Sequence, residues 1–180
     1  MPPSHRDGSV PDVTANSSGW QRIARRIAAA LRPTASRRPA APRPKPGDYP
    51  GDFTGPFTIT YEPHPDEVAD PGEVVWTWVP FEEDHSQGKD RPVVIVGRDQ
   101  PWLLAVPMTS KDHQRDAAQE AEEGRYWVDI GSGEWDRSGR PSEVRVNRIL
   151  RIDPATIRRG AGKLDKPRFE AVAEGIRRHW

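Results

Sequence analysis

The strongest constraint on the fold is a series of short apolar segments between residues 73 and 152, each bounded by turn-forming residues. The segments EVVWTWVPF, RPVVIVG and WLLAVPMTS are rich in β-branched and aromatic residues, which favour strands. RYWVDIG and SEVRVNRILRI continue the series, and the last alternates apolar and polar residues as a half-buried strand does. The series predicts five strands, over residues 73–81, 91–97, 102–110, 125–131 and 142–152.

Two helices are expected after these strands. Asp153 is followed by Pro154, a favourable first helical residue, and the pattern predicts a short helix that ends at Gly160. Asp165 is the expected N-cap of a final helix, which would place Phe169, Val172, Ala173 and Ile176 on one face. Short strands followed by terminal helices indicate a mainly β fold, either a small barrel or a curled sheet with helical cover.

The chain before residue 72 has a different character, since many of the 20 prolines lie there. Residues 1–46 are expected to be a disordered, basic, proline-rich arm with one short amphipathic helix near 19–32. That helix would dock on a partner, a membrane surface or nucleic acid, or else pack on its own domain. Residues 47–71 hold one candidate strand at 57–61 and are expected to form an extra strand or an extended strap. Residues 72–180 form the predicted main domain.

The formal net charge is zero but unevenly distributed. Residues 1–46 carry +7, residues 47–139 carry −13 and residues 140–180 carry +6. The acidic middle argues against a uniformly basic nucleic-acid surface, whereas the basic ends allow one locally. The acidic stretch from Asp112 to Glu123 would repel RNA, and it is expected to be a lid or a surface helix.

Several classes of site find no support in the sequence. Cysteine is absent, which excludes disulfides and thiolate metal sites and suits a reducing cytoplasm. The five histidines show no metal-ligand spacing, and no glycine-rich phosphate loop occurs. No cofactor or metal is therefore expected. No apolar run approaches the ~20 residues that span a membrane, and the first ten residues do not resemble a secretory signal.

Three motifs stand in an order that is similar to the MazF/PemK toxins. Gly72-Glu73-Val74-Val75-Trp76 opens the first strand, Arg91-Pro92 opens a valine-rich strand, and Pro107-Met108-Thr109-Ser110 ends the third. The segment SEVRVNRILRID and a final amphipathic helix follow in the same order. This resemblance covers about 110 residues. It implies an SH3-like small barrel, a two-fold homodimer, an antitoxin partner and cleavage of single-stranded RNA without a metal.

The resemblance also implies a site. Arg91 would hold the scissile phosphate and assist proton transfer, and Thr109 would donate a hydrogen bond to the charged phosphorane. A guanidinium suits this role because it binds phosphate oxygens at two points and keeps its charge. The alternative is structural, with Arg91 in an ion pair beside Asp90 and Thr109 merely ending an edge strand.

The sequence departs from the family at one position that matters. The loop glutamate that family members often carry five residues before the arginine is replaced by Ser86, although the adjacent Gln87 matches. Because serine cannot act as a general base as a carboxylate does, His85 and His113 are candidates for that role, with Ser110 beside Thr109 as a further auxiliary. Each histidine has the alternative of being a solvated loop residue.

Two other functions stay open. The same barrel is similar to the CcdB toxins, which bind DNA gyrase and catalyse nothing. In the second alternative, the chain is a degenerate toxin homologue with a regulatory role, which would agree with Ser86 and the acidic middle segment. The Arg-Pro and Pro-x-Thr-Ser motifs favour the RNA-cleaving alternative.

Overall fold

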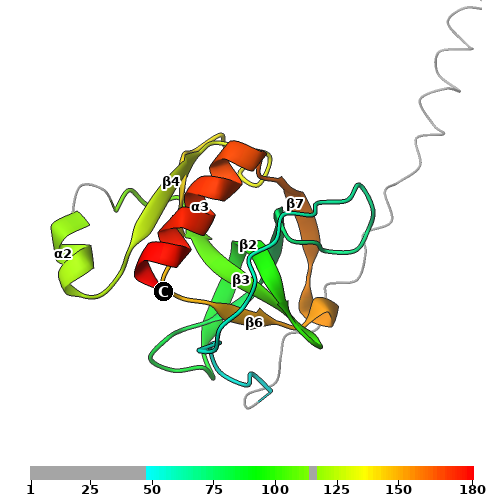
Figure 1. Ribbon diagram of the computed structural model, residues 1–180, viewed down its shortest axis with the longest axis horizontal. Helices are drawn as coiled ribbons and strands as arrows, with labels where there is room; N and C mark the ends of the chain where they lie inside the picture. Colours follow the sequence, from blue (N-terminus) through cyan, green and yellow to red (C-terminus); the bar gives the residue numbers. More distant parts are fainter. Residues whose placement is uncertain (1–47, 114–116) are drawn as a thin grey trace, which may run out of the picture. The chain divides into compact units, whose positions relative to one another are not determined.

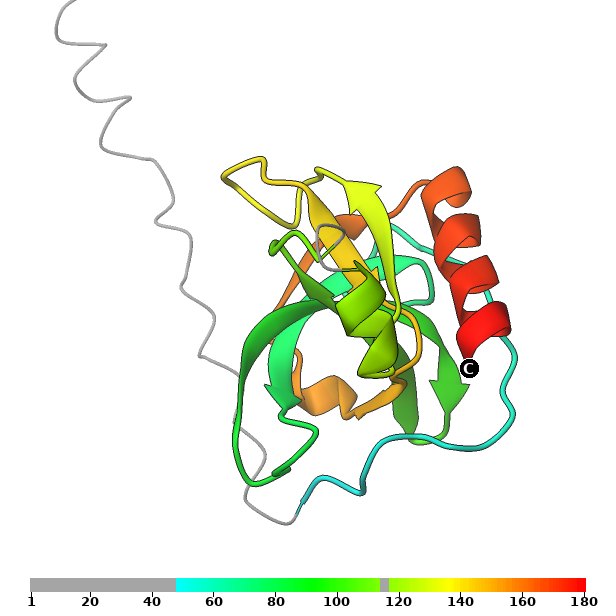
Figure 2. The same cartoon turned by 90° about the vertical axis from the view of Figure 1, so that its left-hand side faces the viewer.

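The computed structural model describes residues 48–113 and 117–180. The arm expected over residues 1–46, with its helix near 19–32, lies outside the described residues. The described part is mainly β with a helix at its C-terminal end (Figures 1 and 2), which confirms the predicted fold class. None of its helices is long and apolar enough to cross a membrane.

The strands form one antiparallel, curled sheet. Its order is β4-β5-β3-β2-β1-β7, with β6 paired to β3. Because the described β4 and β7 are the two free ends of this order, the sheet curls without closing into a complete barrel. The strands are β1 (Glu73–Pro80), β2 (Gly88–Asp99), β3 (Trp102–Thr109), β4 (Trp127–Gly131), β5 (Ser142–Arg145), β6 (Leu150–Ile152) and β7 (Arg159–Lys163).

The predicted strand over 142–152 is wrong as a single element, because it is divided into β5 and β6. Both strands pair with β3, β5 at Met108 and Thr109 and β6 at residues 103–105, in different registers. Pro107 lies in β3 between the two pairings and offers no N–H to a neighbouring strand. The side chain of Asn147 accepts a hydrogen bond from the backbone N–H of Tyr126 at 3.2 Å and so anchors the turn between β5 and β6.

The predicted helix from Pro154 to Gly160 is also wrong in extent. Only one 3₁₀ turn, η2 (Pro154–Thr156), forms after the cap residue Asp153. Gly160 lies in β7, which pairs with β1 through Val75 and Gly160. The segment RGAGK has little strand propensity of its own, and it is extended because it completes the free edge of β1.

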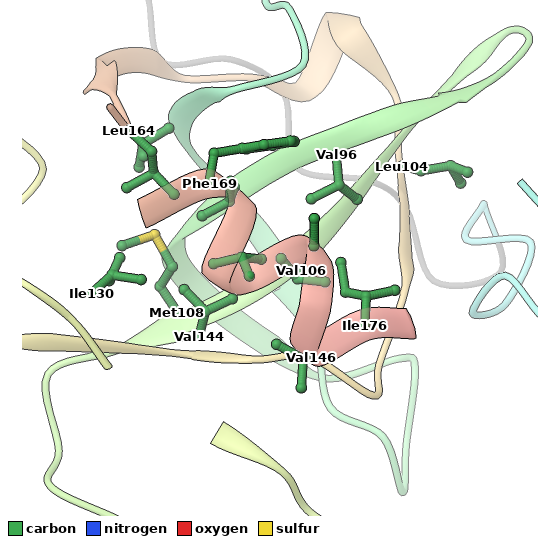
Figure 3. Packing of buried hydrophobic residues seen from close by; sticks show 14 of the residues in the cluster. Val96, Leu104, Val106, Met108, Ile130, Val144, Val146, Leu164, Phe169 and Ile176 are labelled. Atoms are coloured by element: carbon green, nitrogen blue, oxygen red, sulfur yellow. The ribbon is translucent and has the colours of Figure 1, made fainter. Parts of the chain in front are cut away.

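The larger core lies between the sheet and α3 (Lys166–His179), as Figure 3 shows. Asp165 caps this helix as predicted, accepting from the backbone N–H of Arg168 at 2.9 Å. The predicted apolar face is confirmed, since Phe169, Val172, Ala173 and Ile176 are buried. They pack on Val106 and Met108 of β3, on Val144 of β5 and on Val146 just after β5.

The opposite face of the sheet carries a smaller apolar cluster. It is formed by Val75, Val79, Val93, Ile95, Leu103, Ala105, Leu150 and Ile152. The alternating residues of β2 therefore divide between two buried faces, which explains why this strand is almost continuously apolar.

Residues 48–71 run in an extended conformation without forming a regular strand, so the candidate strand at 57–61 is not formed. Phe57, Ile59 and Tyr61 pack against the larger core, and the Tyr61 hydroxyl donates to the carbonyl of Leu164 at 2.8 Å. A Cβ at Gly97 would lie 2.8 Å from the carbonyl oxygen of Thr58, so glycine is needed where this segment crosses the bulge in β2.

Candidate functional site

Arg91 and Thr109 lie where β2 and β3 part from each other. The β2–β3 ladder pairs Ile95 with Ala105 and ends with Val93 opposite Pro107. Beyond that pair β2 continues beside β1, with Arg91 opposite Thr77, whereas β3 turns to β5. Arg91 and Thr109 each stand two residues beyond the last pair. Because strand residues alternate between faces, both belong to the face of the smaller apolar cluster.

The guanidinium of Arg91 has unusually few partners for a half-buried charge. Its Nε is buried and has no hydrogen-bond partner among the described residues, and Arg91 forms no ion pair within them. Burial and the neighbouring Arg148 lower the pKa of Arg91, and Glu83 opposes this shift. Asp90, the alternative partner considered above, pairs with Arg158 instead. Arg91 is therefore a positive charge with an unused donor.

Further cations lie close to Arg91. The charge of Arg91, burial and the charge of Lys111 lower the pKa of Lys89, so Lys89 is close enough to both cations to be repelled by them. Arg148 is buried, donates to the carbonyl of Pro80 at 3.0 Å and forms an ion pair with Asp52 at 2.8 Å. We call Lys89, Arg91, Lys111 and Arg148 the basic cluster. Mutually repelling cations at the end of a sheet face favour an anionic ligand.

Thr109 has its hydroxyl available as a donor. Its Oγ1 accepts a hydrogen bond from the backbone N–H of Lys111 at 3.1 Å. That bond uses a lone pair of the oxygen and leaves the hydroxyl proton to donate elsewhere. Ser110 follows on the exposed side of the strand end.

In the loop between β1 and β2, polar side chains form hydrogen bonds with one another. Asp84 accepts from the Ser86 hydroxyl at 2.6 Å and from the Gln87 amide at 2.7 Å. These bonds lower the pKa of Asp84. His85 contacts the ring of Tyr49 edge-on, with centroids 5.0 Å apart. Ser86 and Gln87 therefore have Asp84 as their side-chain partner, and His85 has Tyr49.

His113 belongs to a different cluster of side chains. Its ring stacks on Trp127 with centroids 4.2 Å apart, and its Nδ1 lies 3.2 Å from Glu120. Glu120 lies on the short surface helix α2 (Ala117–Glu122) and is also bound by Arg125. Hydrogen bonds, above all from Arg125, lower the pKa of Glu120 to about 2. His113 is thus tied to α2 by its ring, whereas its backbone N–H donates to Glu143 on β5 at 3.0 Å.

Glu143 is a site residue that sequence reasoning missed. It lies on β5 directly opposite Thr109 and is buried. Burial raises the pKa of its carboxyl group, whereas the backbone N–H of His113 lowers it. In the sequence, Glu143 is only one polar residue in an alternating segment, and no local signal distinguishes it.

Arg145 connects the same face to the β1–β2 loop. Its two terminal nitrogens donate to the carboxylate of Glu82 at 2.7 and 3.1 Å. The hydrogen bond from Arg145 lowers the pKa of Glu82. Glu82 therefore stays ionised and bound to Arg145, which makes it a poor proton acceptor.

Other features of the described residues lie apart from this face. A hollow of about 490 Å³ is lined by α2, β4 and α3, and its walls include neither Arg91 nor Thr109. No group of three or more His, Asp or Glu residues in 48–113 and 117–180 is arranged to hold a metal ion.

Fold and site together define a small, mainly β protein with an open basic site on one sheet face. The family described as PemK-like, MazF-like toxin of type II toxin-antitoxin system matches residues 70–180. The chain therefore belongs to this toxin family.

The chain is also similar to solved structures. A MazE–MazF crystal structure (form II) from Deinococcus radiodurans is 17% identical, with a TM-score of 0.43, covering 62% of this chain and 94% of that one. MazF (form I) from the same organism is 18% identical, with the same coverage and TM-score. The Mycobacterium tuberculosis toxin MazF-mt6 is 21% identical, with a TM-score of 0.38, covering 58% and 94%. No curated protein matched the chain.

Proposed function

We propose that this toxin is an endoribonuclease that cleaves single-stranded RNA by attack of a ribose 2′-hydroxyl on the adjacent phosphate. The supporting observation is the placement of Arg91 and Thr109 at corresponding positions beyond the last β2–β3 pair, on one face, with Arg91 Nε unpartnered. In the phosphorane the two non-bridging oxygens carry one more negative charge than in the phosphodiester, and these residues supply a bidentate cation and a hydroxyl donor for them.

The chemistry needs no metal-bound water, because the nucleophile is part of the substrate. Arg91 holds the scissile phosphate and Thr109 donates to the oxygen on which negative charge increases. Lys89 and Lys111 attract the flanking phosphates. An open face, rather than an enclosed pocket, suits an extended strand of RNA.

The partner of this toxin in the proposal is an antitoxin protein with an acidic segment that covers the basic cluster. The family supports this, since it is described as a toxin of a type II toxin-antitoxin system. We further propose that the toxin is a two-fold homodimer and that it acts in the cytoplasm. Both points rest on the family alone.

The nature of the nucleophile provides a direct test. An RNA with a single 2′-deoxyribose before the preferred cleavage point should remain uncut there, while the all-ribose RNA is cut to a 2′,3′-cyclic phosphate and a 5′-hydroxyl. Products would be identified by mass spectrometry. Equal cleavage of both RNAs would show that the nucleophile is not the 2′-hydroxyl.

The hydroxyl of Thr109 gives a second prediction. Thr109→Val keeps the shape of the side chain but removes the donor, and we expect the single-turnover cleavage rate to fall by about 10²-fold, as for one oxyanion donor. Thr109→Ser restores a hydroxyl and should recover most of the rate. If the valine and serine variants cleave equally well, the hydroxyl has no role in the reaction.

A further inference from the structure

Three polar residues from three strands stand in one row beside the site. Thr109 on β3 is paired with Glu143 on β5, and Glu143 is paired with Asp129 on β4. Directly opposed residues of antiparallel strands share a face and have close Cβ atoms. The neighbouring row of Met108, Val144 and Val128 points the other way, into or against the larger core. Glu143 therefore lies on the same face as Thr109 and Arg91.

Among the described residues, the carboxylate of Glu143 has a hydrogen-bond partner at one oxygen only. Oε2 accepts from the backbone N–H of His113 at 3.0 Å. Oε1 has no hydrogen-bond partner among the described residues. It is nevertheless not one of their buried unpartnered atoms, which are Asp90 Oδ1 and Arg91 Nε. One oxygen therefore positions the group, and the other accepts no hydrogen bond from the described residues.

The surroundings of Glu143 make it a better proton acceptor than the other carboxylates near the site. Burial raises the pKa of its carboxyl group, and the charges of Asp112 and Asp129 raise it further. The backbone N–H and ring of His113 act in the opposite direction. Bonds from Arg145 and from Ser86 lower the pKa of Glu82 and Asp84 respectively. A base whose pKa lies closer to neutrality accepts a proton more effectively.

We propose that the Glu143 carboxylate is the general base that removes the proton from the ribose 2′-hydroxyl beside Thr109. This inference rests on the proposed function, and it fills the role left open where Ser86 stands in place of the loop glutamate. The residue comes from a strand rather than from the loop, adjacent to the hydroxyl that supports the phosphorane.

The 2′-O–H bond breaks and its proton goes to Glu143 Oε1, while the 2′ oxygen forms a bond to phosphorus. The bond from phosphorus to the 5′ oxygen then breaks, and the departing oxygen takes a proton from a water molecule. The hydroxide that remains takes the proton from Glu143 and restores the carboxylate.

Glu143→Gln is the primary test, on the full chain with single-stranded RNA. The amide retains an oxygen that can accept from His113 N–H but cannot act as the base. We expect the single-turnover rate to fall by about 10²–10⁴-fold. Binding of an uncleavable 2′-deoxy-substituted RNA should change less than threefold. Glu170→Gln is the matched control, since Glu170 is exposed on α3, which packs on the larger core rather than on the face of Thr109. Its rate at neutral pH should remain within threefold of the wild type.

The stability of the same variant separates a chemical role from a structural one. A carboxyl group whose pKa is raised by folding stabilises the native state below its unfolded pKa and loses that contribution as pH rises. Glu143→Gln should therefore have an equal or higher Tm at pH 7, despite its low activity. If the variant instead fails to fold, the pH profile of wild-type cleavage decides whether Glu143 is the general base. It must show an acid limb above the ordinary glutamate range, and the limb must move to lower pH in Asp129→Asn.

The leaving group distinguishes a base from an acid. An RNA with sulfur in place of the 5′ oxygen at the cleavage point loses that atom without protonation. A deficit of Glu143→Gln that persists with this RNA supports the base, and a deficit that disappears contradicts it. A folded Glu143→Gln that cleaves ordinary RNA within threefold of the wild type also overturns the inference. Failure of the wild type to cleave any RNA would instead refute the proposed function itself.

Discussion

Replacing Arg91 by alanine is expected to lower the rate of RNA cleavage by about 10²–10³-fold, the loss typical of a single donor to a developing oxyanion. The structure gives this residue a positive charge without an ion-pair partner among the described residues and a buried Nε that has no acceptor. Burial and Arg148 lower its pKa, so the fold does not stabilise the charge. Loss of Arg91 should therefore leave the free energy of unfolding unchanged or slightly higher.

Two further variants make the Arg91 result specific. Arg91→Lys keeps the charge but not the planar two-point donor, and it should recover less than a tenth of the wild-type rate. Arg98→Ala is the matched control, because Arg98 lies at the other end of β2 and pairs with Asp70. It should cleave RNA within about threefold of the wild type by the same assay, a margin smaller than one donor's contribution. Arg91→Ala cleaving as well as Arg98→Ala would exclude Arg91 from the reaction.

Replacing Phe169 by alanine is expected to lower the free energy of unfolding by about 3–5 kcal/mol. The ring is 2% exposed, lies in the larger core and contacts the ring of Tyr61 at 4.9 Å between centroids. Its removal leaves a cavity between α3, the sheet and the segment 48–71. For a domain with a total stability of about 5–15 kcal/mol, this is a large fraction.

Urea unfolding of the full chain, followed by tryptophan fluorescence, would measure this change. Glu170→Ala is the control, because it removes an exposed neighbour on the same helix and should shift stability by no more than about 0.5 kcal/mol. A loss below about 1 kcal/mol for Phe169→Ala would mean that α3 does not hold the core together as described.

Much of the fold was predictable because its signals are local. The dense β-branched and aromatic residues of β1, β2 and β3 define strands without reference to the rest of the chain. The cap at Asp165 and the apolar face of α3 are likewise determined by residues that are close together in the sequence. By contrast, β7 has a glycine-rich sequence and exists only because it pairs with β1. The division of residues 142–152 depends on β3, which is distant in sequence.

The same distinction applies to the site. Arg91 and Thr109 were identified through short motifs that resemble a family, and their shared face follows from the register of β2 and β3. Glu143 was missed because its importance arises from pairing with Thr109, after β3 leaves β2 for β5. The loop residues Ser86 and His85 were candidates by position, and the structure gives them the local partners Asp84 and Tyr49.

The central claim is that this toxin cleaves RNA with its own side chains and the 2′-hydroxyl of the substrate. The most direct measurement is incubation of the full-length chain with a mixed single-stranded RNA in the presence of EDTA, followed by sequencing of the new ends. The account predicts cleavage at a short recurring sequence, with 5′-hydroxyl ends. A folded protein that leaves every RNA intact, or that cuts only after a divalent metal is supplied, would contradict it.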